Sequence, residues 1–217
     1  MTSTESSAGK PRLMTPTFAL AWVANFCQFL VFYLSVTTMA LYAVESFGAS
    51  DTVGGFASSA FVLGATCMRV FSGWIVDSVG HKKAALTSLA FVTVVAVAYF
   101  FAHNVAVLIF VRMLHGAGYA LTSTALMAVA QSVIPHERRA EGTGYFALGT
   151  TLATAFGPAL GFFLANNIGY NTLFAVALGA NIVSLVLALV LHYPAEVSSE
   201  KPAFRLRNAV HLSLIHI

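Results

Sequence analysis

Long stretches without a charged side chain alternate with short polar segments along this chain. Residues 13–44, 84–111, 113–136 and 142–195 contain no Asp, Glu, Lys or Arg, and the last stretch is long enough for two membrane crossings. Because about 20 apolar residues span a bilayer as a helix, and the polar run at 166–171 indicates a turn, the pattern predicts six spanning helices. They are expected over residues 17–44, 52–79, 83–103, 105–133, 142–165 and 172–193.

Backbone hydrogen bonding and composition both favour an all-α membrane protein. Irregular backbone cannot face lipid, and the apolar runs lack the alternation of barrel strands. Of the 217 residues, 58% are hydrophobic and 9% are charged, with a mean hydropathy of +0.81. This composition excludes a soluble enzyme, a disordered chain and a disulfide-stapled secreted domain. No metal site, cofactor or nucleic-acid partner is expected, because the cysteines fall inside spans and most basic residues lie in short loops or tails.

Lysine and arginine are distributed unequally between the two ends of the predicted bundle. If the N-terminus is cytosolic, nine of the eleven basic residues lie in cytosolic segments and none lies in an outside loop. The positive-inside rule therefore predicts that both termini are cytosolic, with a cytosolic tail over 1–15 and a cytosolic segment over 194–217. The nine residues are Lys10, Arg12, Lys82, Lys83, Arg138, Arg139, Lys201, Arg205 and Arg207.

The segment between the second and third predicted helices carries candidate chemistry. Asp77 places a carboxylate at a helix C-terminus, where the helix dipole disfavours an anion, so it needs a basic partner or the N-terminus of another helix. Gly73 lets a second helix approach closely, and Gly80 permits a tight turn. Lys82 and Lys83 begin the next helix. The alternative is a charged loop that only obeys the positive-inside rule.

Two arginines lie inside the predicted spans, where a charge is costly and is expected to face protein or water. Arg69 shares a helix stripe with Asp77, about 15 Å from the helix end, and either supports this stripe or snorkels toward the cytosol. Arg112, His115 and Tyr119 share one face of the span at 105–133. This face predicts a water-filled cavity or, alternatively, a packing contact of Arg112 with a neighbouring helix.

The first span has a comparable polar stripe. Asn25 and Gln28 are three residues apart, Tyr33 is close by, and nothing else in the span explains the burial of two amides. The first and fourth spans are equivalent positions in a three-plus-three inverted repeat, so both stripes are expected to face one central cavity. Since the first span contains no Asp or Glu, this part of the chain offers no obvious carboxylate for carrying a proton.

The span at 142–165 has a face of small residues that includes Gly149, Gly157 and Gly161. Such a face predicts close packing against another helix. Pro158 lacks an N–H group, so it frees the carbonyl of Thr154 and allows the helix to bend.

Three of these segments resemble signatures of the major facilitator superfamily. Residues 112–118 resemble its R-x-x-x-G-x-G pattern, and residues 157–161 resemble G-P-x-x-G. Residues 73–83 resemble G-x-x-x-D-[RK]-x-G-[RK]-[RK], with matches at Gly73, Asp77, Gly80 and Lys82, and with Ser78 and His81 at usually basic positions. The resemblance implies a cytosolic gate at this loop, proton transfer that involves Arg112, and a fifth helix of the kind found in exporters that exchange substrate for protons.

The resemblance covers residues 15–205 and implies the amino-terminal six-helix half of a twelve-helix transporter, in a bacterial inner membrane. The activity it implies is proton-coupled efflux of a small molecule by alternating access. The second half would be missing, and 194–217 would be a truncated linker. A half-size transporter that works as a dimer and a non-transporting membrane scaffold remain alternatives. A protease is disfavoured because neither G-x-S-x-G nor H-E-x-x-H occurs in the sequence. A voltage-gated channel is disfavoured because no predicted span contains more than one arginine.

Overall fold

The computed structural model of the chain describes residues 12–193, which form six long α-helices and two short 3-10 helices. The elements are α1 (Pro16–Phe47), α2 (Asp51–Val79), α3 (His81–Ala98), η1 (Tyr99–Phe101), α4 (Val105–Val133), η2 (His136–Arg138), α5 (Arg139–Asn167) and α6 (Tyr170–Val190). All six long helices are long and apolar enough to cross a membrane, and residues 12–193 contain no strand. The predicted all-α class with six spans is confirmed. Residues 1–11 of the expected tail and the expected linker at 194–217 lie outside the described residues.

Local capping explains where the helices begin and end. The Thr15 hydroxyl accepts a hydrogen bond from the Phe18 N–H at 3.1 Å, and Pro16 occupies the first turn, so α1 begins one residue earlier than expected. Gly48 adopts a left-handed conformation with φ 63° and ends α1 three residues later than expected. After Ala98 the helix tightens into η1, whose turn is closed by a hydrogen bond three residues back, from the Ala102 N–H to the Tyr99 carbonyl at 3.3 Å.

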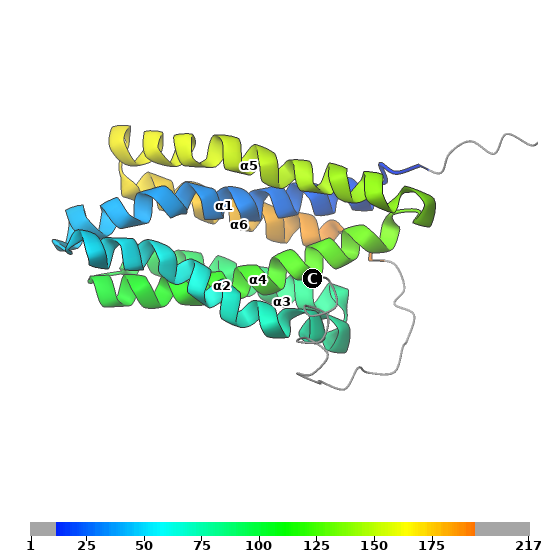
Figure 1. Cartoon of the computed structure of the whole chain (residues 1–217), viewed down its shortest axis with the longest axis horizontal. Helices are drawn as coiled ribbons and strands as arrows, with labels where there is room; N and C mark the ends of the chain where they lie inside the picture. Colours follow the sequence, from blue (N-terminus) through cyan, green and yellow to red (C-terminus); the bar gives the residue numbers. More distant parts are fainter. Residues whose placement is uncertain (1–11, 194–217) are drawn as a thin grey trace, which may run out of the picture.

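The six helices pack as two groups of three, and each group combines one helix from one half of the chain with two helices from the other half. In Figure 1, α1 lies with α5 and α6, whereas α4 lies with α2 and α3. The two groups meet through α1 against α4, α1 against α2, and α3 against α6. If α1, α2 and α3 are exchanged with α4, α5 and α6, the contact of α1 with α5 becomes that of α4 with α2. The contact of α1 with α6 becomes that of α4 with α3. This is the arrangement expected of a three-plus-three inverted repeat.

Backbone meets backbone where α2 crosses α4. A Cβ atom at Gly64 would overlap the backbone carbonyl of Met113, and a Cβ atom at Gly116 would overlap that of Phe61. Both glycines are buried. Small residues permit helices to approach this closely in a membrane, so neither position accepts a side chain unless the helices separate.

Gly64→Ala is expected to destabilise the 217-residue chain by roughly 1–3 kcal/mol, because the added methyl group must push α4 away from α2. Gly55→Ala on the same helix is the matched control, since nothing lies within 4 Å of its added Cβ. Alanine favours a helix more than glycine does, so the control should keep or raise the melting temperature. Thermal unfolding of both variants in detergent, followed by circular dichroism, measures the difference. Equal melting temperatures would contradict the close approach.

Candidate functional site

Arg112 lies completely buried where α4 meets α2. Its Nε donates to the carbonyl oxygen of Ala57 at 3.3 Å, and its Nη2 donates to that of Ser58 at 2.8 Å. The guanidinium also lies over the Phe61 ring, 5.0 Å from the centroid. Its Nη1 is buried and has no hydrogen-bond partner among residues 12–193. The group therefore ties α4 to α2 and keeps donor capacity for one further acceptor.

His115 and Tyr99 extend this polar group into the interior of the bundle. The Tyr99 hydroxyl lies 3.1 Å from His115 Nδ1, and it also lies beside the Arg112 guanidinium. All three side chains are buried. Tyr99 belongs to η1, so the tightened end of α3 carries its ring to α4. Tyr99 is not recognisable from the sequence as part of this group, because a single Tyr at the end of an apolar helix does not indicate its partner.

Tyr119 belongs to a cluster of aromatic rings between α1, α2 and α4. The ring centroids of Phe29, Phe32 and Phe61 lie 5.5, 5.8 and 5.2 Å from that of Tyr119. Edge-on and offset ring contacts of this kind are favourable. Only 6% of Tyr119 is exposed, so within these six helices aromatic rings cover the face of α4 that the sequence assigns to a cavity.

The polar side chains of α1 lie against two different helices. Gln28 Nε2 donates to Asn181 Oδ1 of α6 at 2.9 Å, and both amides are buried. Asn25 is also buried, and its Oδ1 has no hydrogen-bond partner among the described residues. Tyr33 is half-buried and packs against Gly157 of α5. Asn181 is not recognisable from the sequence as a partner of Gln28, because it is an isolated amide in an otherwise apolar span.

Arg69 differs from Arg112 in that it is exposed. Its Nη2 lies 3.5 Å from Ser123 Oγ of α4. Arg69 therefore links the stripe of α2 to the centre of the bundle, while its guanidinium stays accessible.

An exposed stripe runs along the whole length of α2. Its members are small or polar, apart from one valine, whereas Leu63, Val70 and Trp74 beside it are exposed and bulky. The stripe consists of Gly55, Ser59, Val62, Thr66, Arg69, Gly73 and Asp77. A Cβ at Gly73 would meet no atom within 4 Å. This stripe is covered by none of the described helices, and its charges are poorly suited to contact with lipid.

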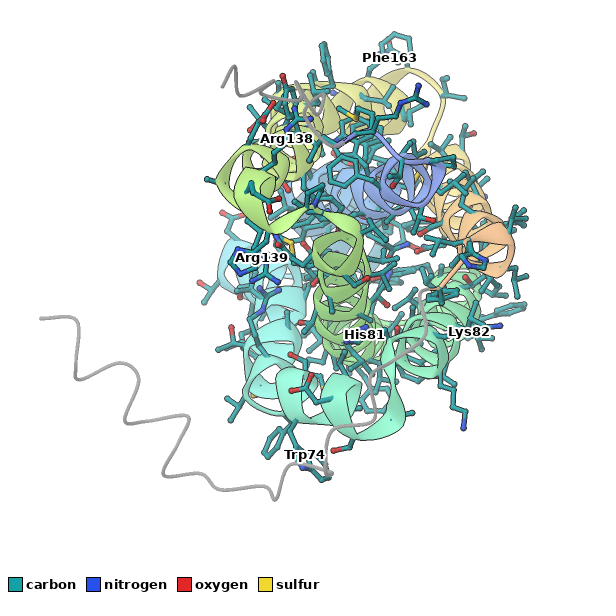
Figure 2. The ribbon with its side chains drawn as sticks, turned by 90° about the vertical axis from the view of Figure 1, so that its right-hand side faces the viewer. Trp74, His81, Lys82, Arg138, Arg139 and Phe163 are labelled. Atoms are coloured by element: carbon teal, nitrogen blue, oxygen red, sulfur yellow. The ribbon has the colours of Figure 1, made fainter. Side chains whose placement is uncertain are left out.

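The loop residues of the predicted gate lie at one end of the bundle. Gly80 has φ 93°, which lets the chain pass directly from α2 into α3, and its N–H donates to the Val76 carbonyl. Lys82 and Lys83 are exposed at the start of α3. Figure 2 shows His81, Lys82, Arg138 and Arg139 at this same end, so the basic residues of two loops gather there.

The small face of α5 packs on α1. A Cβ at Gly149 would lie 3.2 Å from the Trp22 ring, and one at Gly161 would overlap the Leu34 backbone. Gly157 meets Tyr33 in the same way, and Pro158 beside it is half-buried. This face takes the same place against α1 that the Gly64 region of α2 takes against α4.

Comparison with known proteins agrees with this architecture. A family model described as the Major Facilitator Superfamily matches residues 21–216. The multi-drug resistance efflux pump PmrA of Streptococcus pneumoniae is 31% identical over 161 residues, which are 71% of this chain and 39% of the pump. The probable multidrug resistance protein EmrY of Escherichia coli is 25% identical over 180 residues, which are 81% of this chain and 34% of that protein.

A solved structure has the same fold. A peptide transporter in complex with alafosfalin superposes with a TM-score of 0.73 at 16% identity, over 91% of this chain and 44% of that one. The chain thus spans less than half the length of this transporter and of the two relatives above.

The Gln28–Asn181 bond is expected to hold α6 on α1. Gln28→Leu alone should lower the free energy of unfolding by about 1–3 kcal/mol, because it leaves the buried Asn181 oxygen without its donor. Adding Asn181→Leu removes both polar groups, so the double variant should lose less stability than the two single variants summed. Denaturant unfolding of the four proteins in mixed micelles measures this coupling. Strictly additive losses would contradict the bond.

Proposed function

Because the chain belongs to the Major Facilitator Superfamily, we propose that it acts as the amino-terminal half of a secondary active transporter that exports a small molecule in exchange for protons. The observation that carries this proposal is the similarity to a multi-drug resistance efflux pump over 71% of the chain and to a probable multidrug resistance protein over 81%. Membership of a transporter family also gives the chain a role in transport and not in catalysis.

In this proposal the substrate binds near the middle of the membrane, between this half and a second six-helix unit, and rocking of the two gives alternating access. The centre formed by α1 and α4 lines the site. Its residues are Asn25, Gln28, Tyr33, Arg112, His115 and Tyr119. Exposed Arg69, which reaches Ser123 on α4, supports a polar substrate-facing surface. Gln28 contributes by positioning α1, because its amide already binds Asn181.

The proposed proton step assigns Arg112 an electrostatic role. A guanidinium stays protonated at any pH that the protein meets, so Arg112 acts by stabilising an anion and not by carrying the proton itself. The buried Nη1 donor supports this role, since it has room for one more acceptor. As α1 contains a single acid, Glu45, near its far end, the carboxylate that carries the proton is expected in the second unit.

The gate is proposed at the end of the bundle that carries Asp77, Lys82 and Lys83. The basic residues of the α2–α3 and α4–α5 loops lie together there, which supports a cytosolic location for this end and for both termini. The membrane in this proposal is a bacterial inner membrane, and the bacterial source of the two relatives supports a bacterial membrane.

The exposed stripe of α2 supports a partner that covers it, and we propose that this partner is the second six-helix half. Residues 194–217 would form the linker to it. A second copy of this chain could take the same place in a half-size transporter, and a scaffold would have no transport activity at all.

The purified 217-residue chain is expected not to transport when it is diluted to one copy per liposome. Proton release from vesicles that contain a pH-sensitive dye, in response to a panel of multidrug-exporter substrates, measures this activity. Transport at one copy per vesicle would contradict the proposal. Transport that appears only at several copies per vesicle would identify the half-size dimer.

Arg112→Ala in the twelve-helix protein that this proposal requires should abolish proton-driven efflux. Substrate exchange without net proton movement should persist, because that exchange does not need the proton step. Efflux and exchange measured on the same folded preparation separate the two, with the melting temperature as a check, since the loss of Arg112 removes two hydrogen bonds between α4 and the backbone of α2. Unchanged proton-driven efflux would remove Arg112 from the mechanism.

A further inference from the structure

Two hollows adjoin at the end of the bundle where α1 begins and α5 begins. The larger, of about 510 Å³, is lined by Arg12, Leu13, Met14, Arg138, Glu141 and Tyr145. The smaller, of about 270 Å³, continues between α1 and α5, with Phe18, Trp22, Val23 and Leu148 among its lining residues. Met14 and Tyr145 border both hollows, so they form one continuous site with two different surfaces.

The larger hollow is basic. It holds two guanidinium groups and one carboxylate, which gives it a net charge of +1. Glu141 binds Arg138 through two hydrogen bonds of 2.8 and 2.7 Å, so the guanidinium is held in a fixed orientation. Arg12, which carries the other guanidinium, is exposed, and Leu13 next to it is buried against the start of α1. Figure 2 shows Arg138 at the basic end of the bundle.

The smaller hollow is apolar. The Trp22 indole N–H already donates to the Tyr145 carbonyl at 2.9 Å, so the polar atom of this ring is satisfied. Beyond the hollow, Leu152 and Phe156 continue the exposed surface of α5, and side chains of this size and polarity are typical of a surface that faces lipid. The groove therefore leads from the basic hollow into the hydrocarbon region.

We infer that the two hollows together bind one anionic phospholipid. Its phosphate lies between Arg12 and Arg138, and one acyl chain follows the groove past Trp22. Planar guanidinium groups suit phosphate oxygens, and basic pockets near a membrane surface select anionic headgroups. A groove without polar groups suits a hydrocarbon chain and not a free phosphate ion. The site is independent of the substrate and of the direction of transport.

Quenching of Trp22 fluorescence tests this inference directly. The chain has two tryptophans, so Trp74→Phe leaves Trp22 as the single reporter. Brominated acyl chains quench a tryptophan that they contact. Phosphatidylglycerol with such chains should quench Trp22 in detergent at lower concentration than phosphatidylcholine with the same chains. Glycerol 3-phosphate, the soluble headgroup, should neither quench nor compete at equal concentration.

Arg12→Gln should raise the half-quenching concentration of phosphatidylglycerol about fivefold, the effect of one basic residue at a membrane surface. Arg139→Gln is the matched control, because Arg139 is exposed in the same region but does not line either hollow. Native mass spectrometry of retained lipid gives an independent readout, and an unchanged melting temperature confirms folding. Equal quenching by the two lipids, or equal shifts in the two variants, would overturn the site. Competition by glycerol 3-phosphate would replace it with a site for a soluble anion.

Discussion

The close approach of α2 and α4 fixes the position of Arg112, and much of the bundle depends on that position. Because Gly64 and Gly116 allow the two backbones to touch, the guanidinium can reach the carbonyls of Ala57 and Ser58. A buried charge without such acceptors would be prohibitively costly. The glycines and the arginine therefore act together. The ring of Phe61, which lies under the guanidinium, also joins the aromatic cluster around Tyr119 and so extends the contact to α1.

The other group of helices uses the same geometry with different chemistry. Gly157 and Gly161 bring α5 onto α1, and in place of a buried arginine this group has amide and hydroxyl hydrogen bonds between α1 and α6. Gln28 binds Asn181, and Ser184 Oγ donates to the Ala24 carbonyl at 3.0 Å. One group of helices thus holds a permanent charge at its glycine crossing, and the other holds neutral polar groups between α1 and α6. This difference breaks the internal symmetry in charge while preserving it in shape.

The charge-free runs predicted the spans because lipid restricts the backbone to helices and keeps most charges at the ends. The packing face of α5 could also be predicted, because the spacing of its glycines places them on one side of the helix. Contacts with main-chain atoms could not be predicted, because the carbonyls that Arg112 binds are present at every residue. Tyr99 and Asn181 were missed for a related reason. Each is a single polar residue whose partner lies on another helix, and only the three-dimensional arrangement pairs them.

The exchange of helices between the two groups also has a consequence for biosynthesis. α1 is made first, yet Gln28 must wait for Asn181, 153 residues later, before its amide can be paired. At ordinary rates of translation this interval is roughly 8 to 30 seconds. During that time α1 resides in the membrane without the partner of its Gln28 amide. The helix therefore needs a temporary polar neighbour, from water, the insertion machinery or α4, until α6 is made.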